Sequence, residues 1–271
     1  LHRVLLAGAF SLGVVCAVTP WTLRNCEKLG ACTVISANGG WNLLIGTFEE
    51  GRGAWTPIAG ERVPEGCREV FDEVGKDRCF ARAARRRIQS DFGAWLGLLP
   101  QKLRVTFDYA GAASAYLKEA GTFTESGFVL LRNSEQVAMR LMLVGLGLFW
   151  AALPTWIFRQ RFGFFVLGKT RAALRAVWMA AFGLAAGCFP WCFAVVAPVY
   201  GLTLKGARQQ PTVLWWIGVL GSLVAVHGVF FGAARYAMPA LLLEIPLSSV
   251  GFYLFARQLA VARRRSFDSE G

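Results

Sequence analysis

Five long stretches of apolar residues near the two ends of the chain constrain its fold more than any other feature. They extend over residues 4–23, 141–158, 176–204, 209–234 and 236–256, and Glu244 is the one Asp, Glu, Lys or Arg within them. A helix needs about 20 apolar residues to cross a hydrocarbon core roughly 30 Å thick, and each stretch comes near or exceeds that length. The sequence therefore predicts an all-α polytopic membrane protein with four to five membrane segments.

A polar segment of more than a hundred residues separates the first apolar stretch from the second. We interpret this segment, residues 24–140, as an external, periplasmic-side loop domain. It follows a transmembrane segment at residues 1–23 and precedes a membrane bundle at 141–257 and a basic cytoplasmic tail at 258–271. This organisation predicts a multipass protein of the plasma (inner) membrane.

Two parts of the external domain have a recognisable local pattern. From Phe80 to Leu103 the apolar residues recur every three or four positions, which predicts an amphipathic helix near residues 80–107 that Pro100 bends or ends. Its apolar face either lies in the membrane surface or packs onto the core of the domain. Residues 38–66 are rich in glycine and proline, which predicts a loop.

The formal net charge of +12 is concentrated beside the apolar stretches and not in the external domain. One basic group lies between residues 159 and 175, and a second between residues 257 and 265. Basic residues next to membrane segments are typical of cytoplasmic loops, whereas nucleic-acid binding needs a basic face on one domain. We therefore expect membrane lipids, and no nucleic acid, as partners.

The first apolar stretch has two interpretations. His2 and Arg3 precede it, as in a signal peptide, but Pro20 and Trp21 follow without the expected cleavage pattern. We interpret it as a retained span. The chain begins at Leu1 and not at methionine, which suggests a fragment of a longer protein.

The topology depends on the stretch at residues 176–204. If both basic groups are cytoplasmic, an even number of crossings separates them, yet three apolar stretches do so. Pro190 and Pro198 favour a broken or re-entrant path for this stretch, which would place residues 24–140 and Arg235 outside. The alternative is a single crossing that violates the charge rule.

Four cysteines lie in the external domain: Cys26, Cys32, Cys67 and Cys79. An even number in an oxidising compartment predicts disulfides, and local pairing of the first two and of the last two is the expected connectivity. Unpaired thiols are the alternative. No histidine lies among them, so we expect no metal site.

Two short segments contain candidate functional residues. The segment Thr19-Pro20-Trp21-Thr22-Leu23-Arg24-Asn25 places a cation at the membrane surface, where a guanidinium can hold a lipid phosphate or can merely anchor the helix. The segment from His227 to Pro239 joins the last two apolar stretches. Ionisable residues in membrane segments are costly, so three are functional candidates or members of a structural ion pair: His227, Arg235 and Glu244.

These segments resemble the later half of bacterial GT-C glycosyltransferases, which are similar to protein O-mannosyltransferases and the lipid A aminoarabinose transferase. The resemblance rests on Pro-Trp-x-x-Arg-Asn at residues 20–25, Leu29-Gly30, the run from Ser36 to Thr47, Pro-x-Lys at 100–102 and Phe-Phe-Gly-x-x-Arg-Tyr-x-x-Pro at 230–239. It implies an integral-membrane enzyme that transfers a sugar from a polyprenyl-phosphate donor, without a cofactor, to an acceptor on the outer face of the membrane.

The resemblance also suggests roles for individual residues. Arg24 and Arg235 would bind the donor phosphate, and four residues would line the sugar or acceptor site: Asn25, Asn38, Asn42 and Tyr236. Such enzymes have an essential aspartate in the first external loop, and this loop has no counterpart here. The nearest acids, Glu27, Glu49 and Glu50, do not match it, so the chain is similar to a C-terminal portion whose catalytic residue is unknown.

Two other functions fit the same residues. The first is a transporter or flippase for lipids or lipid-linked sugars, in which Arg24 and Arg235 only guide anionic lipid. The second is a noncatalytic membrane assembly subunit. Release of sugar from a labelled polyprenyl donor would distinguish the enzyme from both.

Overall fold

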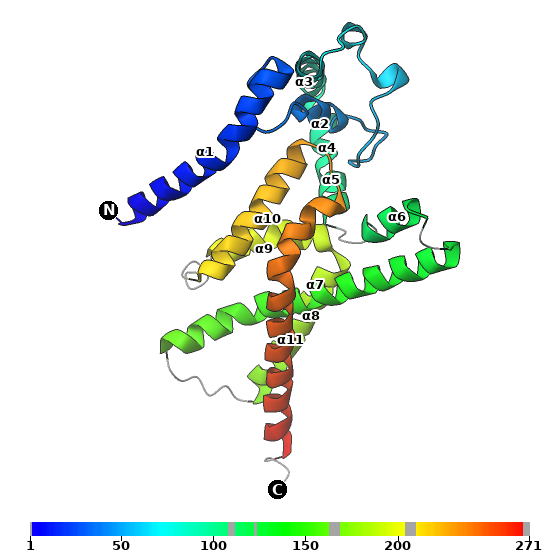
Figure 1. The fold of residues 1–271 in the computed structure, drawn as a ribbon. Coiled ribbons are helices and arrows are strands. Elements are labelled where there is room, and N and C mark those ends of the chain that lie inside the picture. Colours follow the sequence, from blue (N-terminus) through cyan, green and yellow to red (C-terminus); the bar gives the residue numbers. More distant parts are fainter. Residues whose placement is uncertain (1, 108–111, 122–123, 163–168, 204–209, 268–271) are drawn as a thin grey trace. The chain divides into compact units, whose positions relative to one another are not determined.

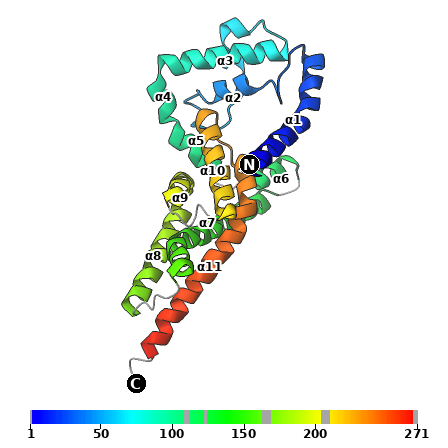
Figure 2. The same ribbon diagram turned by 90° about the vertical axis from the view of Figure 1, so that its left-hand side faces the viewer.

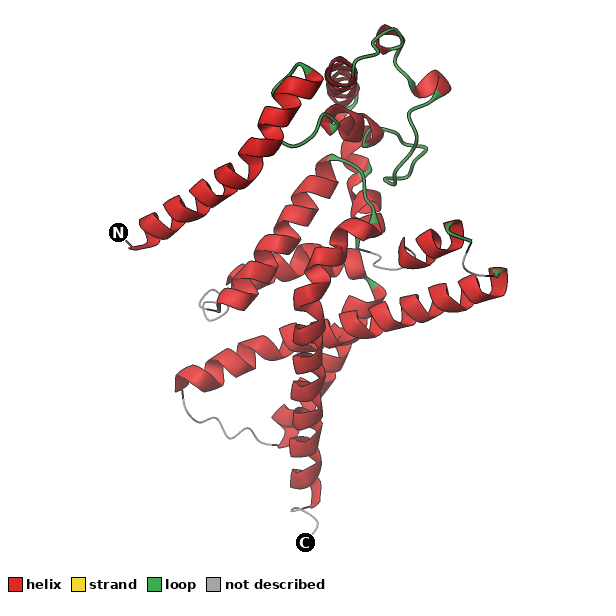
Figure 3. Cartoon of the chain, viewed as in Figure 1, coloured by secondary structure: helices red, strands yellow, loops and turns green. Residues whose placement is uncertain are grey.

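The computed structural model describes residues 2–107, 112–121, 124–162, 169–203 and 210–267, and this part of the chain is helical, with no strand (Figure 3). The helices are drawn in Figure 1 and have the following bounds: α1 (His2–Leu29), α2 (Gly39–Ile45), α3 (Glu73–Ser90), α4 (Phe92–Gly97), α5 (Leu99–Thr106), α6 (Ala112–Glu119), α7 (Glu125–Phe162), α8 (Lys169–Cys188), α9 (Pro190–Thr203), α10 (Pro211–Val229) and α11 (Met238–Phe267). Short 3-10 turns lie at Gly60–Arg62, Glu65–Cys67 and, as η4, Ala234–Ala237.

Contacts divide the chain into two compact units. The first unit contains residues 1–99 and 229–231, and the second contains residues 100–228 and 232–271. The boundary falls inside the segment 24–140 that we predicted as one external domain. Helix α6 and the first part of α7 pack against each other in the second unit, and α7 continues without interruption from the polar segment into the apolar stretch.

The core of the first unit lies between α2 and α3. A side chain at Gly40 would collide with the backbone carbonyl of Asp77, so the two helices touch through backbone at this point. The Trp41 amide donates to the Asp77 carboxylate at 3.0 Å, and the Trp41 and Phe80 rings meet edge to face at 4.7 Å. Phe80 is fully buried, so this part of the amphipathic pattern packs onto the core of its own unit. Helix α2 corrects our prediction of a loop through residues 38–66.

The amphipathic helix predicted near residues 80–107 is three helices. Helix α3 ends at Ser90, and Asp91 caps α4 by accepting a hydrogen bond from the Ala94 amide at 2.8 Å. Pro100 lies in the first turn of α5, where the missing N–H removes no helical hydrogen bond. The break that we predicted before Pro100 is present, and the break at Asp91 is an additional one.

The second unit contains the helices suited to a bilayer. Among the described residues, three segments are long and apolar enough to span a membrane: Glu125–Leu153, Pro211–Val229 and Ala234–Ala262. They include or overlap the second, fourth and fifth apolar stretches. The third stretch is split at Phe189 into α8 and α9, which point in different directions (Figures 1 and 2). The first stretch lies in α1, where Phe10 and Leu12 are exposed.

Small residues allow α7, α8 and α11 to pack closely in the second unit. A side chain at Gly251 of α11 would collide with the Gly145 carbonyl of α7, and one at Gly145 would collide with Ser248. On the other side of α7, a Cβ at Gly147 would lie 2.8 Å from both Ala186 and Gly183 of α8. Close approach through small residues is typical of membrane helices, because lipid leaves little hydrophobic drive for association. Figure 2 shows α7 crossing α11.

Some predicted features differ in extent or lie outside the described residues. Helix α11 continues to Phe267, so most of the predicted tail at 258–271 is helical. The described residues do not include 163–168, within the first basic group, or 268–271, at the end of the predicted tail.

Candidate functional site

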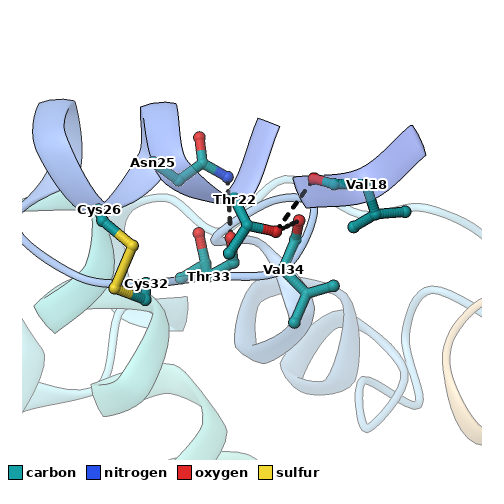
Figure 4. The surroundings of a disulfide bond; sticks show 7 residues. All are labelled: Val18, Thr22, Asn25, Cys26, Cys32, Thr33 and Val34. Atoms are coloured by element: carbon teal, nitrogen blue, oxygen red, sulfur yellow. Dashed lines mark hydrogen bonds between the residues drawn. A yellow bond between two sulfur atoms is a disulfide. The ribbon is translucent and has the colours of Figure 1, made fainter. Parts of the chain in front are cut away.

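Side chains near the C-terminal end of α1 bind the backbone of residues 33–35, which follow the helix. Trp21 Nε1 donates to the Ile35 carbonyl at 2.6 Å, and Thr22 Oγ1 donates to the Val34 carbonyl at 2.8 Å. Asn25 Nδ2 donates to the carbonyls of Thr33 and Ile35 at 3.0 and 3.1 Å. Figure 4 shows Thr22 and Asn25 with Thr33 and Val34, beside a disulfide that closes the turn between Cys26 and Cys32. Three residues of the Pro-Trp-Thr-Leu-Arg-Asn segment thus bind backbone carbonyls.

This arrangement separates the roles of Arg24 and Asn25. Asn25 is 2% exposed and its amide is occupied by backbone, so its position supports a structural role and not the sugar-binding role that we predicted. Arg24 is exposed: its Nη1 donates to Asn25 Oδ1 at 3.3 Å, and its guanidinium lies 5.0 Å from the centre of the Trp21 ring. Among the described residues no carboxylate pairs with Arg24.

The two other predicted amides of the first unit lie at α2. Asn38 precedes the helix, is exposed and accepts a hydrogen bond from Ser36 Oγ at 2.7 Å. Asn42 is half-buried within the helix. In the described part of the chain neither amide is hydrogen-bonded to Arg24. Both positions therefore stay predictions as sugar contacts.

Arg235 lies in the second unit, and two tyrosine hydroxyls hold it. Its Nη1 donates to the Tyr116 hydroxyl at 2.6 Å and its Nη2 to the Tyr236 hydroxyl at 3.1 Å. The Tyr236 ring in turn stacks on the ring of His227, with centroids 4.9 Å apart. No described carboxylate pairs with Arg235, and the two tyrosine hydroxyls are neutral, so they do not compensate its positive charge. A structural ion pair between Arg235 and Glu244 is therefore not present, although Glu244 is buried within α11.

A buried lysine contacts the residue that follows His227. Lys102 of α5 is fully buried, and its Nζ donates to the Gly228 carbonyl, one residue after His227, at 3.2 Å. A side chain at Gly232 would collide with the Lys102 carbonyl, so the turn after α10 touches α5 through backbone. Burial lowers the pKa of Lys102 to about 8. We name Lys102, Tyr116, His227, Arg235 and Tyr236 the cationic cluster.

Two members of the cationic cluster were not predicted as site residues. Lys102 contributed only to the Pro-x-Lys resemblance, and Tyr116 to nothing. Lys102 lies 126 residues from its partner in the chain and Tyr116 lies 119 residues from Arg235, so no local pattern signals either contact. A lysine at an inward position of an amphipathic helix was the available signal for Lys102, because that position otherwise holds apolar residues.

The four cysteines between residues 26 and 79 form the two local pairs that we predicted. Cys26 is bonded to Cys32, and Cys67 to Cys79, which ties the turn at Glu65–Cys67 to α3. Cys67 is fully buried, so the second bond is part of the core of the first unit. The thiols of Cys16, Cys188 and Cys192 are free.

The acids near the first apolar stretch are at the surface. Glu27 lies 3.3 Å from Lys28, and Glu50 lies 3.3 Å from Arg62. A backbone hydrogen bond, together with Arg62, lowers the pKa of Glu50. A carboxylate with a lowered pKa is a weaker general base, so Glu50 has the properties of an ordinary loop carboxylate.

No protein-family model matches the chain, and no curated protein or solved structure matches it either.

Proposed function

We propose that this chain is an integral-membrane glycosyltransferase, or the C-terminal part of one, that binds the phosphate of a polyprenyl-phosphate-linked sugar. The observation that carries the proposal is the setting of Arg235. Two tyrosine hydroxyls fix its guanidinium at the start of a candidate membrane span, and no described carboxylate neutralises it. The resemblance of residues 20–47 and 230–239 to GT-C enzymes supplies the reaction class.

The geometry of Arg235 suits a lipid phosphate. A guanidinium has five N–H donors, and the two hydrogen bonds to tyrosine leave others for a ligand. A planar fork binds phosphate in a bidentate manner, and a partly desolvated site strengthens such hydrogen bonds. His227 and Lys102 add polar groups with a proton to give or accept. The expected chemistry is stabilisation of the departing phosphate while a general base, unknown here, deprotonates the acceptor.

Arg24 supports the same proposal in the first unit. It too is a cation at the end of an apolar helix without a described carboxylate partner. Because Asn25 is occupied, we keep Asn38, Asn42 and Tyr236 as candidates for contact with the sugar or the acceptor.

A transporter of lipid-linked sugars is the second candidate function. The break between α8 and α9 favours it, because discontinuous helices whose ends meet inside the membrane are common at transporter binding sites. A transporter would move the labelled lipid between leaflets and leave the sugar attached, whereas a transferase would release it.

The test uses the protein expressed from its complete gene, in membranes, with a radiolabelled polyprenyl-phosphate sugar. We expect Arg235→Ala to weaken donor binding or transfer roughly ten- to hundredfold, the equivalent of about 1.5–3 kcal/mol for hydrogen bonds to a charged group. Lysine should rescue only partly, because it provides a point charge. Arg257→Ala is the matched control, since Arg257 lies over a tyrosine ring of the same helix α11. Equal binding by the Arg235 and Arg257 variants would refute the phosphate role.

A further inference from the structure

A cavity of about 510 Å³ in the second unit has the lining of a site for an anionic molecule. It lies among α5, the first half of α7 and the junction of α8 with α9. Its polar lining comes from Arg104, Gln136 and Arg140, and its aromatic lining from Phe107, Phe189 and Trp191. Among the described residues this lining holds no carboxylate, and its two formal charges, on Arg104 and Arg140, are both positive. None of these residues belongs to the cationic cluster.

The two arginines of the cavity are prepared for a ligand in different ways. Arg140 Nη1 donates to the Gly187 carbonyl at 2.6 Å, which orders its side chain against the end of α8. Arg104 is exposed and has no hydrogen bond or ion pair with any described side chain. One guanidinium is therefore preorganised, and the other keeps its donors for a ligand.

The break between α8 and α9 adds a third favourable element. Helix α9 begins at Pro190, and its 14 residues are long enough to give its N-terminus a partial positive charge. The Trp191 amide, in the first turn, has no acceptor within its helix, and Trp191 lines the cavity. Backbone amides at a helix N-terminus favour phosphate, and Trp191 shares the cavity lining with the two arginines.

We propose that this cavity binds a phosphate group that belongs to an amphiphilic molecule. Arg104 and Arg140 would hold the phosphate, and the three aromatic side chains would cover its apolar neighbour. Sites of about this volume, apolar with a few convergent polar groups, are typical of small-molecule binding. The phosphate can come from a lipid headgroup or from a soluble phosphate ester, and the test distinguishes the two sources.

Cys188 provides a built-in reporter, because its free thiol also lines the cavity. The full chain in detergent is alkylated with N-ethylmaleimide, and mass spectrometry follows Cys188 and, as an internal control, Cys16. The probes are dihexanoyl phosphatidate, dihexanoylglycerol, glycerol 3-phosphate and inorganic phosphate. We expect phosphatidate to slow alkylation of Cys188 at least fivefold at saturation and to leave Cys16 unchanged.

Variants separate phosphate binding from simple occlusion of the thiol. Arg104→Ala should raise the phosphatidate concentration for half-protection about tenfold, the change expected for one charged hydrogen bond. Arg104→Ala removes no hydrogen bond or ion pair with a described residue, whereas Arg140→Ala also loses its hydrogen bond to the Gly187 carbonyl. Arg235→Ala is expected to leave the protection unchanged, so this test is independent of the proposed function.

Each outcome decides a point. Protection by phosphatidate alone supports a lipid source, and equal protection by glycerol 3-phosphate or inorganic phosphate supports a soluble source. Equal protection by dihexanoylglycerol, insensitive to Arg104→Ala, would mean an apolar pocket only and would overturn the proposal. No protection by any probe would overturn it as well.

Discussion

The stability of the second unit should rise with pH above about 8 because of Lys102. Its side chain is fully buried, and this burial lowers its pKa from 10.5 to about 8. Below pH 8 the folded and unfolded states both carry the ammonium, and the folded state bears the full cost of burying it. Between pH 8 and 10.5 the folded protein has lost the proton that the unfolded chain still binds, so stability rises with pH in this window.

The size of the effect follows from the two pKa values. A change from 10.5 to about 8 corresponds to about 3 kcal/mol, at roughly 1.4 kcal/mol for each pH unit. Lys102→Met keeps an unbranched chain of similar length and removes the titration. It also removes the hydrogen bond to the Gly228 carbonyl, a loss of about 1 kcal/mol that is nearly independent of pH.

The measurement is the free energy of unfolding in detergent at pH values from 7 to 11. Subtracting the Lys102→Met curve from the wild-type curve removes the titration of all other groups. The difference should rise by up to about 3 kcal/mol across the window and then level off. Lys118→Met is the matched control, because Lys118 is exposed and paired with Glu125 at 2.9 Å. A difference that stays flat from pH 7 to 11 would refute burial of a charged Lys102, and one that falls would mean that a carboxylate stabilises the ammonium.

Three further predictions concern disulfides, packing and the cationic cluster. Alkylation of the denatured protein without reductant should modify only Cys16, Cys188 and Cys192, and modification of any of the other four cysteines would contradict the pairing. Gly40→Ala should destabilise the protein by about 1–3 kcal/mol, because the new Cβ meets the Asp77 carbonyl. Gly39→Ala is the control: open space surrounds it, so this change should be neutral or stabilising by up to about 1 kcal/mol. Equal denaturation midpoints for the two variants would show that α2 and α3 do not touch at Gly40. Tyr116→Phe removes one hydrogen-bond acceptor of Arg235 and should weaken binding of the polyprenyl-phosphate sugar about two- to tenfold without changing stability. Tyr253→Phe is the control, because Tyr253 lies under Arg257 and not beside Arg235; it should change neither the binding nor the stability.

The three candidate membrane-spanning helices were predictable from the sequence, because the length of an apolar run decides whether it can span a bilayer. The segments Glu125–Leu153, Pro211–Val229 and Ala234–Ala262 overlap three of the five runs. The break before Pro190 was also predictable, because proline removes a helical hydrogen bond. The two disulfides were predictable as well, because they join cysteines that are only 6 and 12 positions apart, respectively, and closing a short loop costs little entropy.

The features that sequence reasoning missed depend on contacts between distant segments. Paired glycines at positions 39 and 40 are typical of a loop, so they misled the prediction. Position 40 needs a glycine for another reason: the backbone of α3 passes so close that a side chain would not fit. The sequence alone does not distinguish an asparagine that contacts a sugar from one that binds backbone carbonyls, as Asn25 binds those of Thr33 and Ile35. The Lys102 hydrogen bond joins residues 126 positions apart, and only the fold brings them together.

The path of α8 and α9 yields the last prediction, on membrane sidedness. The apolar parts of these helices, Ala173–Cys188 and Pro190–Thr203, are about 24 Å and 21 Å long at 1.5 Å per residue. Each is shorter than a hydrocarbon core of roughly 30 Å, and the chain changes direction between them (Figure 1). We therefore expect this pair to enter and leave the membrane on one side.

With a re-entrant pair, only α10 and α11 cross between the basic group at 159–175 and the one at 257–265, so both groups lie on the cytoplasmic side as the charge rule requires. Single cysteines at Gly168, Ala233 and Ser269, in a background with Cys16, Cys188 and Cys192 changed to serine, test this with a membrane-impermeant maleimide. Gly168 and Ser269 lie outside the described residues, so this expectation rests on charge and helix length alone. Ala233 should react in intact cells, and the other two only after permeabilisation. If positions 168 and 269 lie on opposite sides, the pair crosses once and the re-entrant path is wrong; if both react from outside while position 233 is protected, the whole orientation is inverted.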